Sequence, residues 1–393
     1  MTQDELTSWI KTTAVSHGFS RVGVTSATAL PAAIAERFNH FLAEGLHADM
    51  AYMANHVELR NDPSKLVPGA RSVICLAVAY APRGEGVSPS CLAGVPPASG
   101  GGTDSPSSND SSHGAHNAGE TPASHGVIAR YARGRDYHTA LKRRAIALMD
   151  AIRERVPEFQ GRAFVDSAPV AERSLAVLAG LGVIGRNGCL IVPGLGSYVL
   201  LAEIVCNLGL MADEPSRDAG VPPALCAPWV GTVGDGQPSG AVDGEGGTPS
   251  RHAGKMPASR YMGVSPMCDG CGRCVAACPT GALRSDGLVD ARRCVSYNTI
   301  ENRGELPPDV VAAMRNRVFG CDACQEACPH NQNVPAGDAE FAGPASMDLC
   351  DWLPWDEPQW NAATRGKAIR RATWRMWQRN VVAVLTNRET ERK

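Results

Sequence analysis

The feature that most constrains the fold of this sequence is a dense run of cysteines between residues 268 and 329. The stretch MCDGCGRCVAACP places cysteines at 268, 271, 274 and 278 and ends on a proline. Bacterial iron–sulfur proteins use this C-x2-C-x2-C-x3-C-P spacing, in which three thiolates wrap one cluster and the fourth ligates a second. The segment therefore predicts a small domain folded around two inorganic clusters.

A second run completes the ligand count. The stretch GCDACQEACP contains Cys321, Cys324 and Cys328, and Cys294 in RRCVSY can supply the missing thiolate. The first cluster then takes Cys268, Cys271, Cys274 and Cys328, and the second takes Cys278, Cys294, Cys321 and Cys324. Structural zinc is the alternative, since C-x2-C pairs also bind zinc, but the doubled C-P ending favours two [4Fe–4S] clusters.

The cysteine content and the net charge indicate which cellular compartment and which partners to expect. It has 393 residues and 14 cysteines, 44% of its residues are hydrophobic, and its net charge is −2. Clustered thiols in a reducing compartment indicate metal binding rather than disulfides. No stretch of about 18 apolar residues is present and the N-terminus is unlike a signal peptide, so we expect a cytoplasmic protein without a membrane partner. Contact with nucleic acid would need a local basic patch.

Before the cysteines, helix and strand signals alternate. The expected strands are 21–26, 71–80, 162–167 and a hairpin over 189–207. The expected helices are 2–18, 31–45, 136–156 and 168–182. Thr2 and Glu5 form a capping box that opens the first helix. This order predicts an α/β domain over residues 1–210, with helices covering a sheet.

Two stretches interrupt the pattern. Residues 83–126 and 211–260 are rich in Gly, Pro and Ser, and both contain AGVPPA. Such segments cannot bury enough apolar surface to offset the entropy lost on ordering. We therefore expect two disordered low-complexity insertions, a two-cluster domain at 261–335 and a basic helical segment at 336–393.

One acid stands out in the α/β domain. Phe164 and Val165 look like the end of a buried strand, and Asp166 follows immediately in FVDSAPVAER. A carboxyl at this point can cap the next helix, because Asp and Ser are favoured at helix N-termini. It can also serve chemistry as a general acid, and the residues themselves leave both interpretations open.

These stretches together resemble the epoxyqueuosine reductase family, cobalamin-dependent enzymes that complete the tRNA base queuosine. The resemblance rests on ARYARGRDYH, FVDSAPVAER, AGLGVIGRN, CDGCGRCVAACPTGAL and AIRRATWRMWQRN, and covers about residues 5–385 apart from the insertions. It implies a nitroreductase-like α/β domain, a bacterial-ferredoxin-type two-cluster domain, and cobalamin between them. The implied reaction uses two electrons and two protons to convert an epoxide into an alkene and water.

The resemblance also implies roles for single residues. In the family, the aspartate of the FVDSAP stretch is the proton donor, which here is Asp166. Opening an epoxide develops charge on oxygen, and a neutral carboxyl could protonate it. We expect a corrin ring to remove hydration from Asp166 and so raise its pKa.

Four further residues are expected to contact cobalamin, each with a plainer alternative. Arg60 in ELRNDP could instead be an exposed arginine at a helix end, and Asn187 in GRNG could serve only a tight turn. Ser296 and Asp322, close to cluster cysteines, could make local hydrogen bonds.

The stretch GRDYH resembles a cobalt-ligating D-x-H-x-x-G signature, but position 141 is Leu rather than Gly. Ligation of cobalt by His138 is therefore not expected. We interpret Asp136 as a helix N-cap and His138 as a first-turn residue with a chance of touching substrate.

The expected macromolecular partner is the anticodon loop of a tRNA carrying epoxyqueuosine. Residues 358–388 contain no acid, and their arginines alternate with Trp360, Trp374 and Trp377, so this segment could bind phosphates or could dock as a helix with tryptophans inward. We expect a monomer fed by an external electron donor such as flavodoxin or ferredoxin. The alternatives are a related cobalamin reductase of a small molecule, resembling reductive dehalogenases, and a ferredoxin-like electron carrier.

Overall fold

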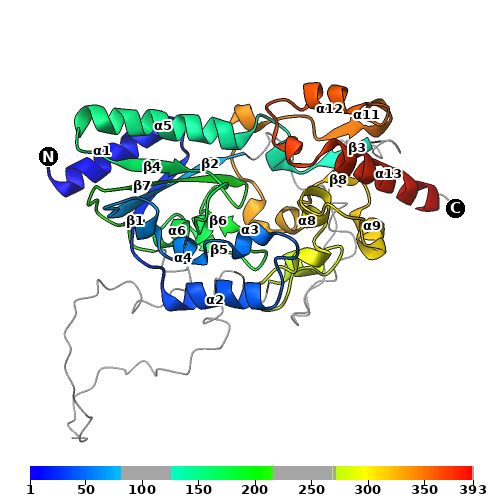
Figure 1. The fold of residues 1–393 in the computed structure, drawn as a ribbon, viewed down its shortest axis with the longest axis horizontal. Coiled ribbons are helices and arrows are strands. Elements are labelled where there is room, and N and C mark those ends of the chain that lie inside the picture. Colours follow the sequence, from blue (N-terminus) through cyan, green and yellow to red (C-terminus); the bar gives the residue numbers. More distant parts are fainter. Residues whose placement is uncertain (81–124, 216–267, 269–270, 392–393) are drawn as a thin grey trace, which may run out of the picture.

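The computed structural model describes residues 1–80, 125–215, 268 and 271–391, with side chains up to residue 387. Figure 1 shows two parts side by side, an α/β part that contains the N-terminus and a smaller part that contains the cysteines and the C-terminus. Within the described residues, no helix is long and apolar enough to cross a membrane.

A four-stranded antiparallel sheet forms the centre of the α/β part, in the order β1-β2-β7-β4. Its strands are β1 (Arg21–Ser26), β2 (Ser72–Ala79), β7 (Val199–Cys206) and β4 (Gly161–Phe164). Both faces of strand β2 are buried, and all of its residues after Ser72 are apolar. Ile74 and Leu76 belong to one core, whereas Val73 and Cys75 belong to the other.

Helices cover both faces of this sheet, as the sequence predicts (Figure 1). Helices α1 (Gln3–Ser16) and α5 (Tyr137–Arg155) lie on one face, and α6 (Glu172–Leu178) lies on the other. The remaining helices of this part, on the α6 side, are α2 (Ala32–Ala43), α3 (Ala51–Ala54) and α4 (Val57–Asn61). The predicted capping box is confirmed, with Thr2 and Glu5 bonding each other's backbone N–H.

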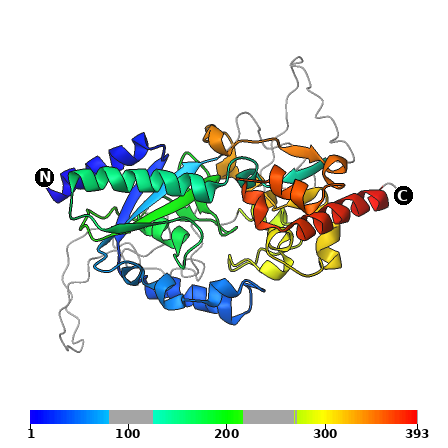
Figure 2. The same cartoon turned by 45° about the horizontal axis from the view of Figure 1, so that its top comes forward.

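The smaller part is organised around a three-stranded sheet in the order β8-β3-β9. The strands are β3 (His125–Ile128), β8 (Arg317–Phe319) and β9 (Ser346–Asp348). The helices are α7 (Arg273–Ala276), α8 (Val295–Ile300), α9 (Pro308–Met314), α10 (Ala323–Glu326), α11 (Leu349–Trp352), α12 (Glu357–Ala363) and α13 (Trp374–Glu391). Figure 2 shows α13 lying along this part toward the C-terminus.

Short 3-10 helices connect these elements: η1 (Pro63–Lys65), η3 (Arg130–Ala132), η8 (Ala291–Arg293), η9 (Pro329–Asn331), η10 (Ala339–Phe341) and η11 (Ala368–Arg371).

Buried hydrogen bonds join the two parts. The amide of Asn331 accepts from the backbone N–H of Ser197 at 2.6 Å and donates to its hydroxyl at 2.9 Å. Within the smaller part, the Asp322 carboxylate accepts from the backbone N–H of Arg130, just after β3, at 2.7 Å. Buried polar groups satisfied by one another fix relative position, because separating them would leave each one unpaired.

Three sequence predictions need correction. The strand predicted over 162–167 ends at Phe164, and the helix predicted over 168–182 begins only at Glu172, since Pro169 lies in an irregular loop. The hairpin predicted over 189–207 is wrong in its pairing. Strand β6 (Leu190–Ile191) pairs with β5 (Val183–Ile184), whereas β7 pairs with β2 and β4. Apolar content shows that a strand is buried but not which strand it pairs with.

The predicted low-complexity segments lie largely outside the described residues, but their edges need correction. His125 and Gly126 belong to β3, and Gly126 faces Leu349 so closely that a Cβ would meet that side chain at 2.5 Å. At the other segment, the Asp213 carboxylate pairs with Lys11 at 2.5 Å and accepts from the Val24 N–H at 2.8 Å. Small residues here serve close packing rather than a low-complexity linker.

The C-terminal helix docks with tryptophans inward, as one interpretation of the basic segment predicts. Trp377 is fully buried and stacks on Trp360 at 4.8 Å between ring centroids. The guanidinium of Arg379 also points toward the protein and donates to the carbonyl oxygens of Asn298, Asn302 and Gly304. An arginine can saturate several free carbonyls at once.

Candidate functional site

Asp166 occupies a tight turn directly after β4. Its φ of +51° lies in the left-handed region, which is uncommon for a residue with a side chain. The N–H of Ser167 donates to the carbonyl of Val165 at 2.6 Å and closes the turn around Asp166. The capping interpretation is wrong, because α6 begins at Glu172 and its N-cap, Ala171, makes no side-chain bond. The Asp166 side chain is instead 56% exposed.

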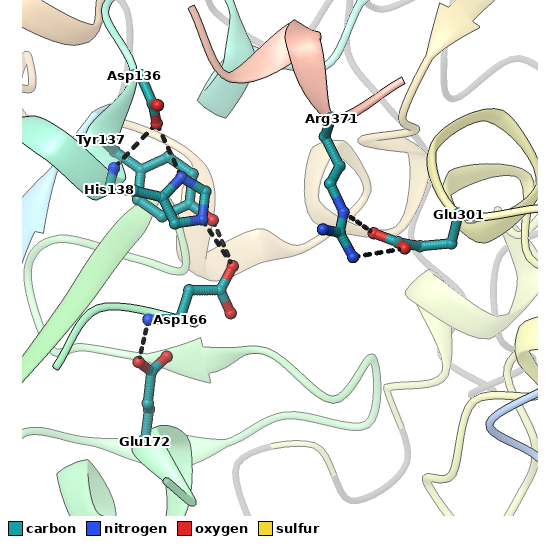
Figure 3. A network of polar contacts seen from close by, with 7 residues as sticks. All are labelled: Asp136, Tyr137, His138, Asp166, Glu172, Glu301 and Arg371. Carbon is teal, nitrogen blue, oxygen red and sulfur yellow. Dashed lines mark hydrogen bonds and ion pairs between the residues drawn. The ribbon is translucent and has the colours of Figure 1, made fainter. Parts of the chain in front are cut away.

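The first turn of α5 brings two donors to this carboxylate. Asp136 caps α5 as predicted, accepting from the His138 N–H at 3.1 Å, and its Oδ1 also lies 2.8 Å from His138 Nδ1. His138 Nε2 lies 3.4 Å from Asp166 Oδ2, and the Tyr137 hydroxyl donates to that same oxygen at 2.5 Å. Figure 3 shows these side chains converging on Asp166.

This constellation acts on the pKa of Asp166 in the direction opposite to the one expected beneath a corrin ring. The hydrogen bond from His138 lowers the pKa of Asp166, and it outweighs burial, which acts in the opposite direction. Burial lowers the pKa of His138, but hydrogen bonds to Asp136 and Asp166 outweigh it and raise that pKa to about 9. An imidazolium and a carboxylate therefore face each other near neutral pH. The raised pKa expected for Asp166 takes account of burial alone and does not include the His138 imidazolium.

Sequence reasoning missed several members of this site. Tyr137 was assigned no role, although it precedes His138 in the motif that suggested the helix cap. Below the turn, the Asp166 N–H donates to Glu172 Oε1 at 2.5 Å, as Figure 3 shows. Glu172 adjoins the fully buried Glu203 of β7, whose neighbours LLA and IVC gave the appearance of an ordinary core strand.

Charged residues of the smaller part face Asp166 from across the site. Arg371 makes a bidentate ion pair with Glu301, with N–O distances of 2.7 and 2.8 Å. Figure 3 places this pair opposite Asp166. The hydrogen bond to Glu301 is the main cause of the raised pKa of Arg371, and the negative charge of Asp166 makes a smaller contribution. The side of Asp166 near α5 opens into a cavity lined by His138, Thr139, Lys142, Arg143, Ile146, Val165 and Ser167.

The first predicted cysteine set is brought together at one pocket. Cys268, Cys271, Cys274 and Cys328 line it, together with Arg186, Asn187, Ile191, Gly272, Pro329 and His330. Burial raises the pKa of Cys274 to about 11, and the neighbouring thiols of Cys268 and Cys328 add to the rise.

The second predicted set is also assembled. Burial raises the pKa of Cys294, with a further contribution from nearby Cys278. Burial also raises the pKa of Cys324, and Cys321 and Cys294 add to it. In the part of the chain that the structure describes, no three His, Cys, Asp or Glu side chains converge tightly enough to hold a single metal ion.

The residues present fit both predicted kinds of cofactor. Two sets of four cysteines are the donor set of two [4Fe–4S] clusters. Asn187 lines the first thiol pocket, and among the described residues its buried Nδ2 has no hydrogen-bond partner. A donor buried without a partner is costly and marks a place where another group can bind. The exposed Asp166 carboxylate is a further polar group that could contact a cofactor or substrate.

Of the other three predicted cobalamin contacts, Arg60 and Asp322 have protein partners. Arg60 donates to the carbonyl of Val170 at 3.1 Å and lies over the Phe38 ring, so it supports the loop after Asp166, whereas its buried Nε has no partner among the described residues. Asp322 is buried and occupied by Arg130. Ser296 is half-buried in the first turn of α8, beside Cys294. Contacts of these residues and Asn187 with cobalamin remain predictions.

Comparison with known proteins places this geometry in context. A family model described as "Epoxyqueuosine reductase QueG" matches residues 108–167, and one described as "4Fe-4S double cluster binding domain" matches residues 267–331. A protein from Cyclobacterium marinum named epoxyqueuosine reductase is 32% identical over 381 residues, covering 97% of each chain. A protein of the same name from Burkholderia pseudomallei is 34% identical over 389 residues, covering 98% of this chain and 81% of its own.

Solved structures share the fold. A crystal structure of epoxyqueuosine reductase with an epoxyqueuosine-modified tRNA-Tyr stem loop superposes with a TM-score of 0.72 at 23% identity, over 98% of this chain and 82% of that chain. A Bacillus subtilis epoxyqueuosine reductase superposes with a TM-score of 0.70 at 22% identity, over 98% of this chain and 82% of that one. Its structure is described as having an aspartate catalytic loop swung out of the active site.

Proposed function

The chain belongs to the epoxyqueuosine reductase family, and we propose that its site reduces epoxyqueuosine to queuosine in tRNA with Asp166 as the proton donor. The observation that carries the residue assignment is the exposed Asp166 carboxylate, held by Tyr137 and His138 in a strained turn between the two parts of the molecule. Strained, exposed and fully oriented side chains are typical of active sites.

The proposed reaction requires two protons to be delivered to the epoxide oxygen. Both C–O bonds of the epoxide break, two electrons form the alkene, and two protons convert the departing oxygen into water. His138, with a pKa near 9, stores a proton at neutral pH, and Asp166 lies between it and the exposed side of the site. Asp166 therefore passes a proton from the His138 imidazolium to the epoxide oxygen as negative charge develops there.

The electrons enter through the cysteine-rich part. Two [4Fe–4S] clusters on the eight cysteines would conduct single electrons, and an external carrier such as flavodoxin or ferredoxin would supply them. Bound cobalamin would hand the electrons to the substrate, since cofactors carry chemistry that side chains cannot. Asn187, at the pocket of the first cysteine set, has an unpartnered Nδ2 that could orient a group there.

Basic residues around the site suit a tRNA loop. Five cationic side chains of the C-terminal segment are exposed: Arg365, Lys367, Arg370, Arg371 and Arg375. On the other side of Asp166, the exposed Lys142 lines the cavity beside His138. Phosphates of a stem loop could contact both groups while an unstacked base reaches Asp166.

The test is mass spectrometry of tRNA nucleosides. A strain that lacks its epoxyqueuosine reductase should regain queuosine when it expresses this chain. Asp166→Asn should leave epoxyqueuosine in place, with turnover lowered by about 10² or more, the size of a general-acid contribution. Asp150→Asn, an exposed acid on α5, is the matched control and should restore queuosine. Persistent epoxyqueuosine with the unmodified chain would refute the function, and full activity of Asp166→Asn would refute the residue assignment.

A further inference from the structure

The left-handed turn at Asp166 requires something to hold it. Residues with side chains avoid positive φ, so a chain keeps such a conformation only where its surroundings determine it. The contacts of the Asp166 carboxylate orient the side chain but do not fix the backbone. The backbone N–H of Asp166 instead donates to Oε1 of Glu172 at 2.5 Å.

Glu172 is itself held firmly. It is the first residue of α6, whose Leu175, Ala176 and Val177 are buried in the core beneath the sheet. The carbonyl of Ala171 accepts from the Leu175 N–H at 2.9 Å, which ties the start of the helix to its first turn. The Glu172 carboxyl therefore projects from a rigid element toward the turn six residues earlier.

A second carboxyl lies beneath the first. Glu203 is fully buried on β7, opposite Phe164 of β4, which is two residues before Asp166. Within the described residues neither of its oxygens makes an ordinary hydrogen bond. Burial raises the pKa of Glu203 well above its usual value, and the adjoining Glu172 raises it further. Two adjoining buried carboxyls cannot both ionise, so the pair keeps a proton near neutral pH.

Several charged groups surround this pair. Burial raises the pKa of Glu172 to about 7, the Asp166 charge adds to the rise, and Arg173 opposes it. Arg60 lies near enough for Glu172 to raise its pKa against the effect of burial. The charge of Glu172 also adds to the raised pKa of two titratable neighbours, Tyr137 on α5 and Cys75 on β2. The effects that favour the neutral form of the pair therefore outweigh the cations beside it.

We propose that Glu172, supported by Glu203, is a positioning residue that holds the Asp166 turn in its left-handed conformation. This inference rests on the proposed function, because positioning matters only if Asp166 delivers a proton. A carbonyl-type oxygen at position 172 is sufficient for the role, since the donor is a backbone N–H. Full ionisation of Glu172 is not needed.

Three variants separate positioning from general stability. Glu172→Gln keeps an acceptor oxygen, Glu172→Met keeps the volume without the acceptor, and Glu172→Ala removes both. The matched control is Glu154→Gln, an exposed acid on α5. All are loaded with clusters and cobalamin, whose visible spectra report occupancy, and are assayed for epoxyqueuosine turnover in a stem-loop RNA. Hydrogen exchange of the peptide spanning residues 162–172 reports the turn itself.

The Met and Ala variants should exchange faster at this peptide and lose kcat by about 10², the usual effect of a small misplacement of a catalytic group, with KM and spectra unchanged. The Gln variant should match the control in both measurements. If Glu172→Ala does not fold, Glu172→Met decides alone. Slow exchange in the Met variant, or a Gln variant as impaired as Met, would overturn the proposal. Exchange is read without turnover, so an inactive wild type would refute only the proposed function.

Discussion

The Glu172–Glu203 pair should make the folded protein lose stability as pH rises through the neutral range. The pKa of Glu172 rises from 4.5 to about 7 in the folded chain, which corresponds to about 3 kcal/mol of tighter proton binding. Because the folded pKa is raised, this stabilisation is complete below about pH 4.5 and declines until about pH 7, where the folded carboxyl also ionises.

The contribution of Glu172 to the pH dependence of stability can be isolated by comparing the wild type with a variant that cannot ionise at this position. Between about pH 5.5 and pH 8 the wild type should lose about 2 kcal/mol through this group. Glu172→Gln cannot ionise and should lack that loss. For a chain of this size the difference corresponds to about 2–5 °C in Tm, measured anaerobically by thermal unfolding of the loaded protein. Glu158→Gln, an exposed acid, should follow the wild type. Equal pH slopes for wild type and Glu172→Gln would refute the reasoning.

Three further outcomes are expected. The wild type should lose kcat above about pH 9, where His138 loses its proton, and His138→Gln should abolish that fall and raise the pKa of Asp166 toward its ordinary value; an unchanged pH profile would remove His138 from the proton path. Cys274→Ala should lower bound iron from about eight to about four atoms per chain, whereas the exposed Cys350→Ala should leave it unchanged; retention of all the iron would contradict the ligand set. Asn380→Leu leaves the carbonyls of Thr299 and Val318 unpaired and should cost about 1–3 kcal/mol in anaerobic urea unfolding, whereas Arg375→Leu on the exposed face of α13 should change it by less than about 0.5 kcal/mol.

Local patterns predicted local structure well. The capping box at Thr2, the N-cap at Asp136 and the apolar strand over Ser72–Ala79 each depend on residues close in sequence, and each is present. The two cysteine sets also follow from spacing, because short intervals leave a thiolate little freedom to reach another partner.

Long-range features could not be predicted in the same way. The pKa of Asp166 depends on His138, 28 residues earlier, and no local signal indicates that α5 begins beside the end of β4. Glu203 was hidden because one acid in an apolar strand resembles a position facing solvent. Gly126 appeared to belong to a low-complexity linker, although it is small because Leu349 packs against it. Each error concerns a partner distant in sequence.

The strand β3 has a consequence for how the enzyme can be divided. In the chain it lies between the two halves of the α/β part, yet it pairs with β8 at Val127–Arg317 and with β9 at Gly126–Met347. A fragment cut out as a stand-alone electron carrier would lose its middle strand and expose two unprotected edges. The cysteine-rich part therefore cannot be separated by a single cut in the chain without losing a strand of its own sheet.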